Sequence, residues 1–289
     1  MNAKPFELAS GKGNLPVLKI HTPWSDAEIY LHGAHVTHFQ KNGEPPLLFM
    51  SHQSWFAEGK AIRGGVPICF PWFGPREGEP AHGLVRTQPW ELVETVVAPD
   101  GSVKVHLRWP QKLWKPEWSA LHTEFIVTVT DTLTMELIAA NESKDKAIEI
   151  ENCLHNYFNV GDISAVSITG LQGGSYLDTS GEGKGARKAQ DEAVLKINKE
   201  TNRIYLNSTA PVEIRDEKFR RTIRVEKANS QSTVVWNPWT TQKLPEDFDP
   251  VEHKNMVCVE TANVKENKIS LGPGKATALK TTLGSAPLK

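Results

Sequence analysis

The sequence predicts an all-β protein built as one large antiparallel β-sandwich. Apolar and polar residues alternate through many short segments rich in Val, Ile, Thr and Trp, a pattern typical of strands with one buried face. Nineteen Pro and 21 Gly supply frequent turns, and helical patterns are few. No composition shift, internal repeat or low-complexity linker divides the chain. We therefore expect a single domain over residues 1–289, a length that one β domain can reach.

The expected strands are marked by Val, Ile, Thr and Trp alternating with polar residues. Residues 123–130 and 134–140, with a turn at 131–133, predict a hairpin. Residues 222–226 and 232–236 predict a second pair. In chain order, the segments with strand character are 28–32, 33–39, 102–109, 123–130, 134–140, 147–151, 222–226 and 232–236.

Helical and irregular segments are fewer. Residues 191–196 form a short helical candidate, and residues 241–256 form a Pro-interrupted connection with about one helical turn. Two long stretches break the strand pattern: residues 59–90, and the Gly-rich residues 170–188. Long irregular loops on a rigid sandwich are where functional sites usually lie, so we expect the site among these loops.

Charge and cysteine content narrow the class of protein. Lys plus Arg number 33 and Asp plus Glu number 34, and this balance argues against nucleic acid or an anionic membrane as the main partner. No segment approaches the roughly 20 apolar residues that span a membrane, and the first residues lack the apolar core of a signal peptide. Cys69, Cys153 and Cys258 are odd in number and widely spaced, which disfavours a disulfide framework. We expect a cytoplasmic protein.

One histidine and one glutamate stand out because each lies in an apolar, strand-like segment. His155 lies within residues 151–162, and Glu260 lies within residues 255–263. An imidazole and a carboxylate held on a sheet can move a proton onto one substrate atom and off another. The alternatives are a hydrogen-bonded core histidine and an exposed glutamate at a strand end. A buried lone carboxylate is costly, which favours a paired or functional Glu260.

Three cationic or polar side chains in the first irregular stretch are candidates for substrate binding. Arg63 and Arg86 lie beside Gly-rich turns, and guanidinium groups match phosphate or carboxylate oxygens. His82 precedes a Gly and can donate to a hydroxyl or an anion. The alternatives are surface ion pairs for the arginines and an ordinary turn histidine for His82.

Three tryptophans are candidates for contact with a sugar. Indole rings can pack against a sugar ring or fill the core, and the candidates are Trp72, Trp236 and Trp239, with Trp236 preferred.

Other chemistries have weak support. His32, His35 and His38 are spaced three apart, and positions 32 and 35 face opposite sides of a strand, so we expect no metal site there. Cys153 lies two residues before His155 on the same face, a poor geometry for a thiol–imidazole dyad, and small-residue packing is the simpler reading. No phosphate-binding loop or dinucleotide-binding glycine motif occurs.

Six motifs in order give the chain a resemblance to a known family. It resembles the hexose-6-phosphate (glucose-6-phosphate) 1-epimerases of the aldose 1-epimerase, or galactose-mutarotase-like, superfamily, over nearly its whole length. Each motif alone is weak, and their order makes the match specific. The motifs are residues 62–74 (IRGGVPICFPWFG), 82–86 (HGLVR), 154–158 (LHNYF), 176–178 (YLD), 235–239 (VWNPW) and 259–263 (VETAN).

The resemblance implies a galactose mutarotase-like supersandwich that interconverts the α and β anomers of a hexose 6-phosphate. It implies that no metal or organic cofactor takes part. We also expect the protein to be a monomer. It assigns the general acid to His155, which would protonate the ring oxygen as an imidazolium, and the general base to Glu260, which would take the C1 hydroxyl proton. The residues that it places around the substrate are Arg63, His82, Arg86 and Asp178.

Two positions depart from the patterns of relatives. Sugar mutarotases commonly have Pro after the catalytic histidine, where this chain has Asn156, which favours the sugar-phosphate branch. Some relatives place Gln before the first histidine motif, where this chain has Ala81. Asp178 is the least secure match because the loop around it varies in length.

Other functions remain open from the sequence alone. The same fold could serve as a non-catalytic carbohydrate-binding module, or as an epimerase of unphosphorylated aldoses. A glycoside hydrolase or lyase is less favoured, because hydrolysis usually needs two carboxylates and Glu260 is the one strong candidate.

Overall fold

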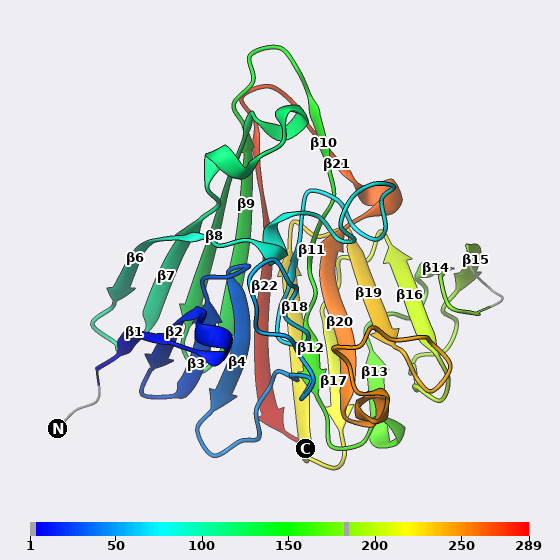
Figure 1. The fold of residues 1–289 in the computed structure, drawn as a ribbon. Coiled ribbons are helices and arrows are strands. Elements are labelled where there is room, and N and C mark those ends of the chain that lie inside the picture. The colour runs from blue at the N-terminus through cyan, green and yellow to red at the C-terminus, as the bar shows by residue number, and fades with distance from the viewer. Residues whose placement is uncertain (1–3, 182–184, 289) are drawn as a thin grey trace.

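The computed structural model describes residues 4–181 and 185–288, and almost all regular structure in them is antiparallel β. A long eight-stranded sheet, here called the back sheet, lies behind two others in Figure 1. Contacts of β3 with β8, and of β11 and β20 with β22, join the three sheets. The expectation of an all-β antiparallel sandwich is confirmed.

The back sheet has the order β13-β17-β18-β22-β9-β8-β7-β6. Its strands β8 and β9 alternate buried and half-exposed residues without interruption, as one covered face requires. The bounds are β6 Glu91–Val97, β7 Val103–Arg108, β8 Leu121–Val129, β9 Leu133–Asn141, β13 Val166–Thr169, β17 Val212–Asp216, β18 Arg221–Ala228 and β22 Ala276–Pro287.

A second eight-stranded sheet, here called the front sheet, has the order β15-β14-β16-β19-β20-β11-β5, with β12 also paired to β20. Every residue of its strand β20 is buried, so β20 is covered on both faces. The bounds are β5 Ile68–Cys69, β11 Asn152–Leu154, β12 Tyr157–Asn159, β14 Ser175–Asp178, β15 Ala186–Ala189, β16 Thr201–Leu206, β19 Ser232–Asn237 and β20 Met256–Asn263.

Smaller elements complete the fold. An N-terminal sheet contains β1 Phe6–Ser10, β2 Pro16–His21, β3 Ser25–Tyr30 and β4 His35–Lys41, and a two-stranded sheet contains β10 Ile148–Ile150 and β21 Ile269–Leu271. The 3-10 helices are η1 Lys12–Asn14, η2 Val85–Thr87, η3 Gln111–Leu113, η4 Pro116–Trp118, η5 Ile163–Ala165, η7 Pro250–Asn255 and η8 Lys265–Asn267. None of the helices in the described ranges is long and apolar enough to cross a membrane.

The predicted hairpin and one predicted pair had different outcomes. Strands β8 and β9 form the expected hairpin, with Val129 opposite Leu133 at its turn. The pair predicted from residues 222–226 and 232–236 is wrong, because β18 lies in the back sheet between β17 and β22, whereas β19 lies in the front sheet between β16 and β20. Alternation shows that one face of each strand is buried, but it does not identify the neighbouring strand.

Two other segments differ from expectation. Residues 191–196 contain no helix, and instead Leu195 bridges to Ile168 and packs into the core. The Gly-rich stretch 170–188, expected to be irregular, contains β14 and part of β15. The single helical turn expected within residues 241–256 is present as η7.

The assigned core can be tested by one substitution in each of two environments. Leu137 is fully buried on β9, and Leu137→Ala should lower the free energy of unfolding by about 2–5 kcal/mol because it leaves a cavity. Leu8 is 57% exposed on β1, and Leu8→Ala should change it by about 0.5 kcal/mol or less. Urea denaturation followed by tryptophan fluorescence measures both, and equal losses would contradict this assignment.

Candidate active site

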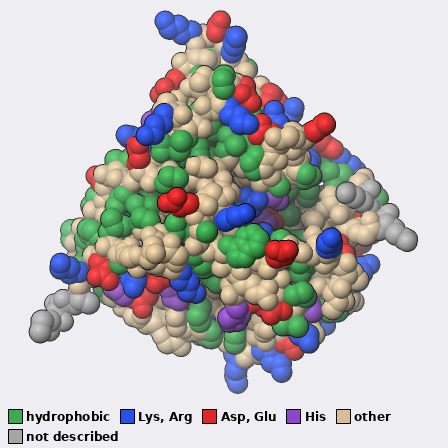
Figure 2. All heavy atoms as spheres, viewed as in Figure 1, with side chains coloured by type: hydrophobic (Ala, Val, Ile, Leu, Met, Phe, Trp, Pro, Cys, Tyr) green, Lys and Arg blue, Asp and Glu red, His purple; other side chains and the backbone are tan. Residues whose placement is uncertain are grey.

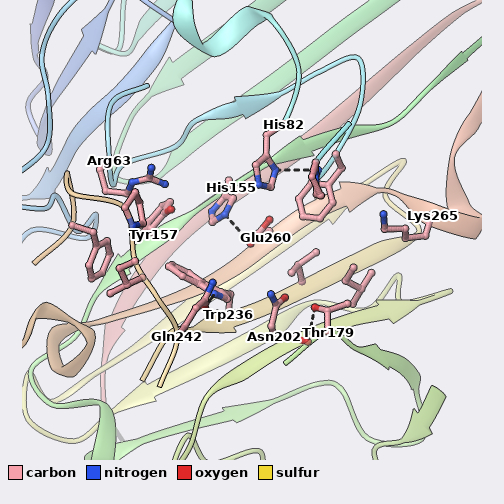
Figure 3. Close-up of a pocket in the computed structure, with 18 residues that line it drawn as sticks. Arg63, His82, His155, Tyr157, Thr179, Asn202, Trp236, Gln242, Glu260 and Lys265 are labelled. Carbon is pink, nitrogen blue, oxygen red and sulfur yellow. Dashed lines mark hydrogen bonds and ion pairs between the residues drawn. The ribbon is translucent and has the colours of Figure 1, made fainter. Parts of the chain in front are cut away.

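A pocket of about 490 Å³ opens over the front sheet. Its floor comes from β16, β19 and β20, and its walls come from the loops around residues 63, 73–75, 82 and 242–248. Figure 2 shows this region as a hollow with histidine atoms inside it. Figure 3 shows Arg63 and Tyr157 toward one end, Lys265 at the other, and His155 with Glu260 between them.

The two candidate catalytic side chains meet at the floor of this pocket. Nε2 of His155 lies 3.2 Å from Oε1 of Glu260, and the side chains are 10% and 1% exposed. Glu260 lies in the middle of β20, opposite Val234 of β19. The sequence suggested that both side chains point off a sheet, and the structure brings the two together.

His155 lies in a short break between β11 and β12 rather than within a strand. Its backbone N–H donates to the carbonyl of Pro67 at 3.1 Å, and the side-chain amide of Asn156 donates to the carbonyl of Val259 at 3.1 Å. The His155 ring stacks on Tyr157, with 4.6 Å between centroids and 13° between planes. These contacts fix the imidazole over Glu260 although the residue is outside regular structure.

Burial shifts the two pKa values in opposite directions. It raises the pKa of Glu260 well above its usual value. It lowers the pKa of His155 well below its usual value, and repulsion from the protonated form of His82 and from Arg86 and Arg63 adds to this effect. In the protein alone these directions favour a carboxylic acid beside a neutral imidazole, rather than the carboxylate and imidazolium expected from the resemblance. Both forms contain one proton shared by the pair.

The two candidate phosphate-binding arginines differ in their relation to the pocket. Arg63 lines it, and its Nε and Nη2 lie 3.3 Å from the two oxygens of Asp247. Burial acts to lower the pKa of Arg63, but Tyr157 and Asp247 outweigh it and the pKa is raised. Arg86 is outside the lining and donates to the carbonyl of Ala81 at 2.8 Å. Burial lowers the pKa of Arg86, and the positive charge of Arg63 adds to this effect.

His82 and Trp236 reach the pocket as expected. His82 has a left-handed backbone, with φ of 64°, and its Nδ1 accepts from the N–H of Gly74 at 3.3 Å. That bond leaves Nε2 of His82 as the protonated nitrogen. Trp236 lies edge-on to His155, with 6.2 Å between centroids, and donates to Gln242 at 2.9 Å. Trp72 and Trp239 do not line the pocket.

Asp178 lies outside the pocket lining. Its carboxylate pairs with Lys188 at 2.7 Å and accepts from the hydroxyl of Ser180 at 2.6 Å. The next residue, Thr179, lines the pocket instead, and its hydroxyl donates to the carbonyl of Asn202 on β16 at 3.0 Å. A role for Asp178 in substrate binding therefore stays a prediction.

The structure adds residues that the sequence reasoning did not single out. Asn202, Gln242 and Lys265 line the pocket, and Asp247 orients Arg63. Asn202 lies on β16, which was not among the predicted strands. Asp247 falls in a connection where the sequence marks only turns. No local pattern distinguishes these side chains from ordinary surface residues.

Three side chains that could serve as metal ligands come together here. Among the described residues, one such group occurs, His155, Cys258 and Glu260, whose potential ligand atoms all lie within 4.8 Å of one another. Glu260 already contacts His155 through one oxygen and accepts from the thiol of Cys153 through the other, at 3.0 Å. Action without a metal or cofactor stays a prediction.

An antiparallel sandwich with a buried imidazole–carboxylate pair beneath a pocket of sugar size defines an enzyme of the sugar-epimerase class. The aldose 1-epimerase family model matches residues 16–284, and the chain belongs to that family. The expected family is confirmed.

Individual relatives cover most of the chain. A protein of Escherichia coli K12 named "Putative glucose-6-phosphate 1-epimerase" is 33% identical over 261 residues, which cover 88% of this chain and 85% of that protein. A protein of Cenchrus ciliaris with the same name is 32% identical over 272 residues, covering 90% and 82%. The solved structure of a "putative mutarotase" from Salmonella typhimurium has a TM-score of 0.86 and 28% identity, covering 98% of this chain and 94% of that one.

The carboxylate of Glu151 joins two walls of the pocket by hydrogen bonds, and this bracing role can be tested by substitution. Glu151 accepts from the backbone N–H of Phe73 at 2.9 Å and from that of Lys265 at 2.6 Å. Glu151→Ala should speed hydrogen exchange at these two amides by about tenfold or more, because each loses an acceptor worth on the order of 1.5 kcal/mol. The matched control is Glu149→Ala, which removes a half-exposed carboxylate paired with Lys268. Equal exchange in both variants would contradict the brace.

Proposed function

We propose that this protein interconverts the α and β anomers of a hexose 6-phosphate, with D-glucose 6-phosphate as the first candidate. The observation that carries the proposal is the 3.2 Å contact between Nε2 of His155 and Oε1 of Glu260 at the floor of the pocket. The names of the Escherichia coli and Cenchrus ciliaris relatives support the choice of a phosphorylated hexose.

Anomer exchange requires two proton transfers at neighbouring oxygens. One proton leaves the C1 hydroxyl and another reaches the ring oxygen, so the C1–ring oxygen bond breaks and an open-chain aldehyde forms. Rotation about C1–C2 and closure on the other face reverse both transfers. Because the two oxygens share one carbon, an acid and a base about 3 Å apart can serve both at once.

In the proposed roles, Glu260 takes the C1 hydroxyl proton and His155 donates to the ring oxygen. The protein alone favours the neutral pair, and transfer of its single proton from Glu260 to His155 across their contact gives the carboxylate and imidazolium that these roles need. The pair begins and ends each cycle with one proton, so no outside acid or base is consumed. Positioned groups of this kind typically contribute about 10²–10⁴-fold in rate.

Arg63 supplies a candidate partner for the 6-phosphate. It lines the pocket, and a phosphate there can accept charge-assisted hydrogen bonds from its guanidinium group. A contact of Arg86 with the phosphate stays a prediction. Asp247 neutralises part of the charge of Arg63 and also orients its guanidinium. His82 and Trp236 would hold the sugar ring, through a hydrogen bond and through apolar contact respectively.

The pocket gives less support to hydrolysis. Glu260 is the one carboxylate among the described lining residues, whereas glycoside hydrolysis usually needs two. A binding module or an epimerase of free aldoses remains the alternative, and the experiments below separate both from the proposal.

The proposal extends to the whole chain. One apolar cluster contains residues from Leu18 to Leu283, which supports a single working domain over residues 1–289. Action as a monomer stays a prediction. A cytoplasmic location agrees with three cysteines that are all free and buried.

The catalytic pair is tested by isosteric variants. His155→Asn and Glu260→Gln should each lower the anomer exchange rate of D-glucose 6-phosphate by about 100-fold or more, because each removes one of the two proton-transfer groups. Exchange spectroscopy by NMR measures the rate. His122→Asn, a histidine on β8 of the back sheet, is the control and should leave the rate unchanged. Near-normal exchange in either site variant would overturn the assignment.

Phosphate selection is tested by comparing two sugars. Arg63→Ala should raise KM for glucose 6-phosphate by about tenfold or more, since a charge-assisted bond is worth on the order of 1.5–3 kcal/mol, and should change the rate on glucose much less. Arg215→Ala, which removes an exposed arginine paired with Glu217, is the matched control. Equal parent rates on both sugars would favour an epimerase of free aldoses.

A further inference from the structure

The second oxygen of the candidate catalytic carboxylate is held by a thiol. Sγ of Cys153 lies 3.0 Å from Oε2 of Glu260, and both side chains are buried. The first oxygen, Oε1, faces His155 and the pocket. The carboxyl group is thus fixed at both ends, and one end is a residue for which the sequence suggested packing alone.

The strand pairing places this thiol. Cys153 lies on β11 opposite Ala262 of β20, two residues beyond Glu260, so the thiol and the carboxylate are diagonal neighbours on the same face of the front sheet. Across the other edge of β11, Cys153 pairs with Cys69 of β5. No lysine or arginine within hydrogen-bond range of Oε2 is found among the described residues, so the thiol is the donor to that oxygen.

A thiol is a weak donor, and this suits a carboxyl group that must exchange its proton. A strong donor would stabilise the carboxylate and lower its pKa far below the working range, whereas an apolar neighbour would leave Oε2 without a partner. Burial raises the pKa of Cys153 well above its usual value, with Cys69 and Glu260 adding to the effect, so the thiol keeps its proton and remains a donor.

We propose that Cys153 is a positioning residue for the epimerase reaction: its thiol holds Oε2 of Glu260 and thereby directs Oε1 toward His155 and the substrate. The expected effect of Cys153 on the reaction rate rests on the proposed function. The expected effect of Cys153 on the pKa of Glu260 does not, because that pKa can be measured without substrate.

The pH response depends on everything that faces Glu260. Besides His155 and Cys153, the titratable and charged neighbours are Cys69 on β5, Tyr157 on β12, Cys258 on β20, and His82, Arg63 and Lys265 on the pocket loops. Cys69 contacts Cys153 directly, so a change at position 153 also reaches Glu260 through Cys69. The sign of the shift separates the two routes, because only the direct one follows the donor strength of the side chain at position 153.

Two substitutions at position 153 should act in opposite directions. Cys153→Ala removes the donor and destabilises the carboxylate, so the pKa of Glu260 should rise; Cys153→Ser supplies a stronger donor, so the pKa should fall, each by on the order of half a unit. The alkaline limb of the kcat/KM profile for glucose 6-phosphate, where the carboxylic acid of Glu260 loses its proton, should move with it. Cys153→Ala should also lose about tenfold in kcat, with Cys153→Ser recovering part of it.

The measurement uses the full chain labelled with 13C at the glutamate carboxyl carbon. The signal of Glu260 is identified by its loss in Glu260→Gln, and its titration is compared in the parent, in both variants and in Cys258→Ala. That last variant deletes a second buried thiol near Glu260 without removing the donor to Oε2, so it measures the effect of losing a neighbouring thiol that is not the donor.

Opposite shifts in the two Cys153 variants support the positioning role. Unshifted titrations, or shifts in the same direction, overturn it and leave packing as the role of Cys153. If Cys153→Ala does not fold, the near-isosteric Cys153→Ser decides alone, because the inference requires its pKa to fall. If the parent does not exchange the anomers of any hexose phosphate, the proposed function fails, while the titration still decides the role of the thiol.

Discussion

The structure depends on one energetically unfavourable feature: the carboxyl group of Glu260 lies in the middle of a strand that is buried along its whole length. Strand β20 is covered by the back sheet on one face and by the pocket loops on the other, so Glu260 cannot be solvated as a surface carboxylate would be. Its two oxygens meet an imidazole and a thiol instead of water. The surrounding fold makes this arrangement tolerable and also makes it chemically useful, because burial brings acid and base toward a common proton.

The sheets and the loops divide the work. The front sheet holds both candidate catalytic side chains. Glu260 lies on β20, and His155 lies in the break between β11 and β12. Because β20 is paired with β19 on one side and with β11 and β12 on the other, both residues have little freedom to move. The loops bring the groups that would recognise a substrate, and these are locked by contacts between distant segments. Arg63 is oriented by Asp247, and the walls at Phe73 and Lys265 are tied together by Glu151. The candidate catalytic groups are thus held by the front sheet, and the candidate substrate-binding groups lie on loops that contacts with distant segments hold in place.

Several features of the fold and the site could be predicted because they depend on patterns of neighbouring residues in the sequence. The alternation in residues 123–130 and 134–140 predicted a hairpin that the structure contains, and the apolar surroundings of His155 and Glu260 marked both as unusual. The pairing of residues 222–226 with 232–236 failed because alternation shows that a face is buried but not which strand covers the edge. Asn202 and Asp247 were missed for a related reason. Their own segments contain no motif, and each belongs to the site only because distant residues pack next to it: Asn202 lines the pocket, and Asp247 pairs with Arg63.

The sequence by itself determined the fold class and the family, because strand periodicity and ordered motifs are properties of neighbouring residues. It also pointed to His155 and Glu260 as the candidate acid and base. Only the tertiary structure decided that they lie 3.2 Å apart, that burial shifts their pKa values in opposite directions, and that the thiol of Cys153 contacts the remaining oxygen of Glu260. Those facts depend on which strands become neighbours and how deeply they are covered. Desolvation and hydrogen bonding act through space, between residues about 100 positions apart in the chain.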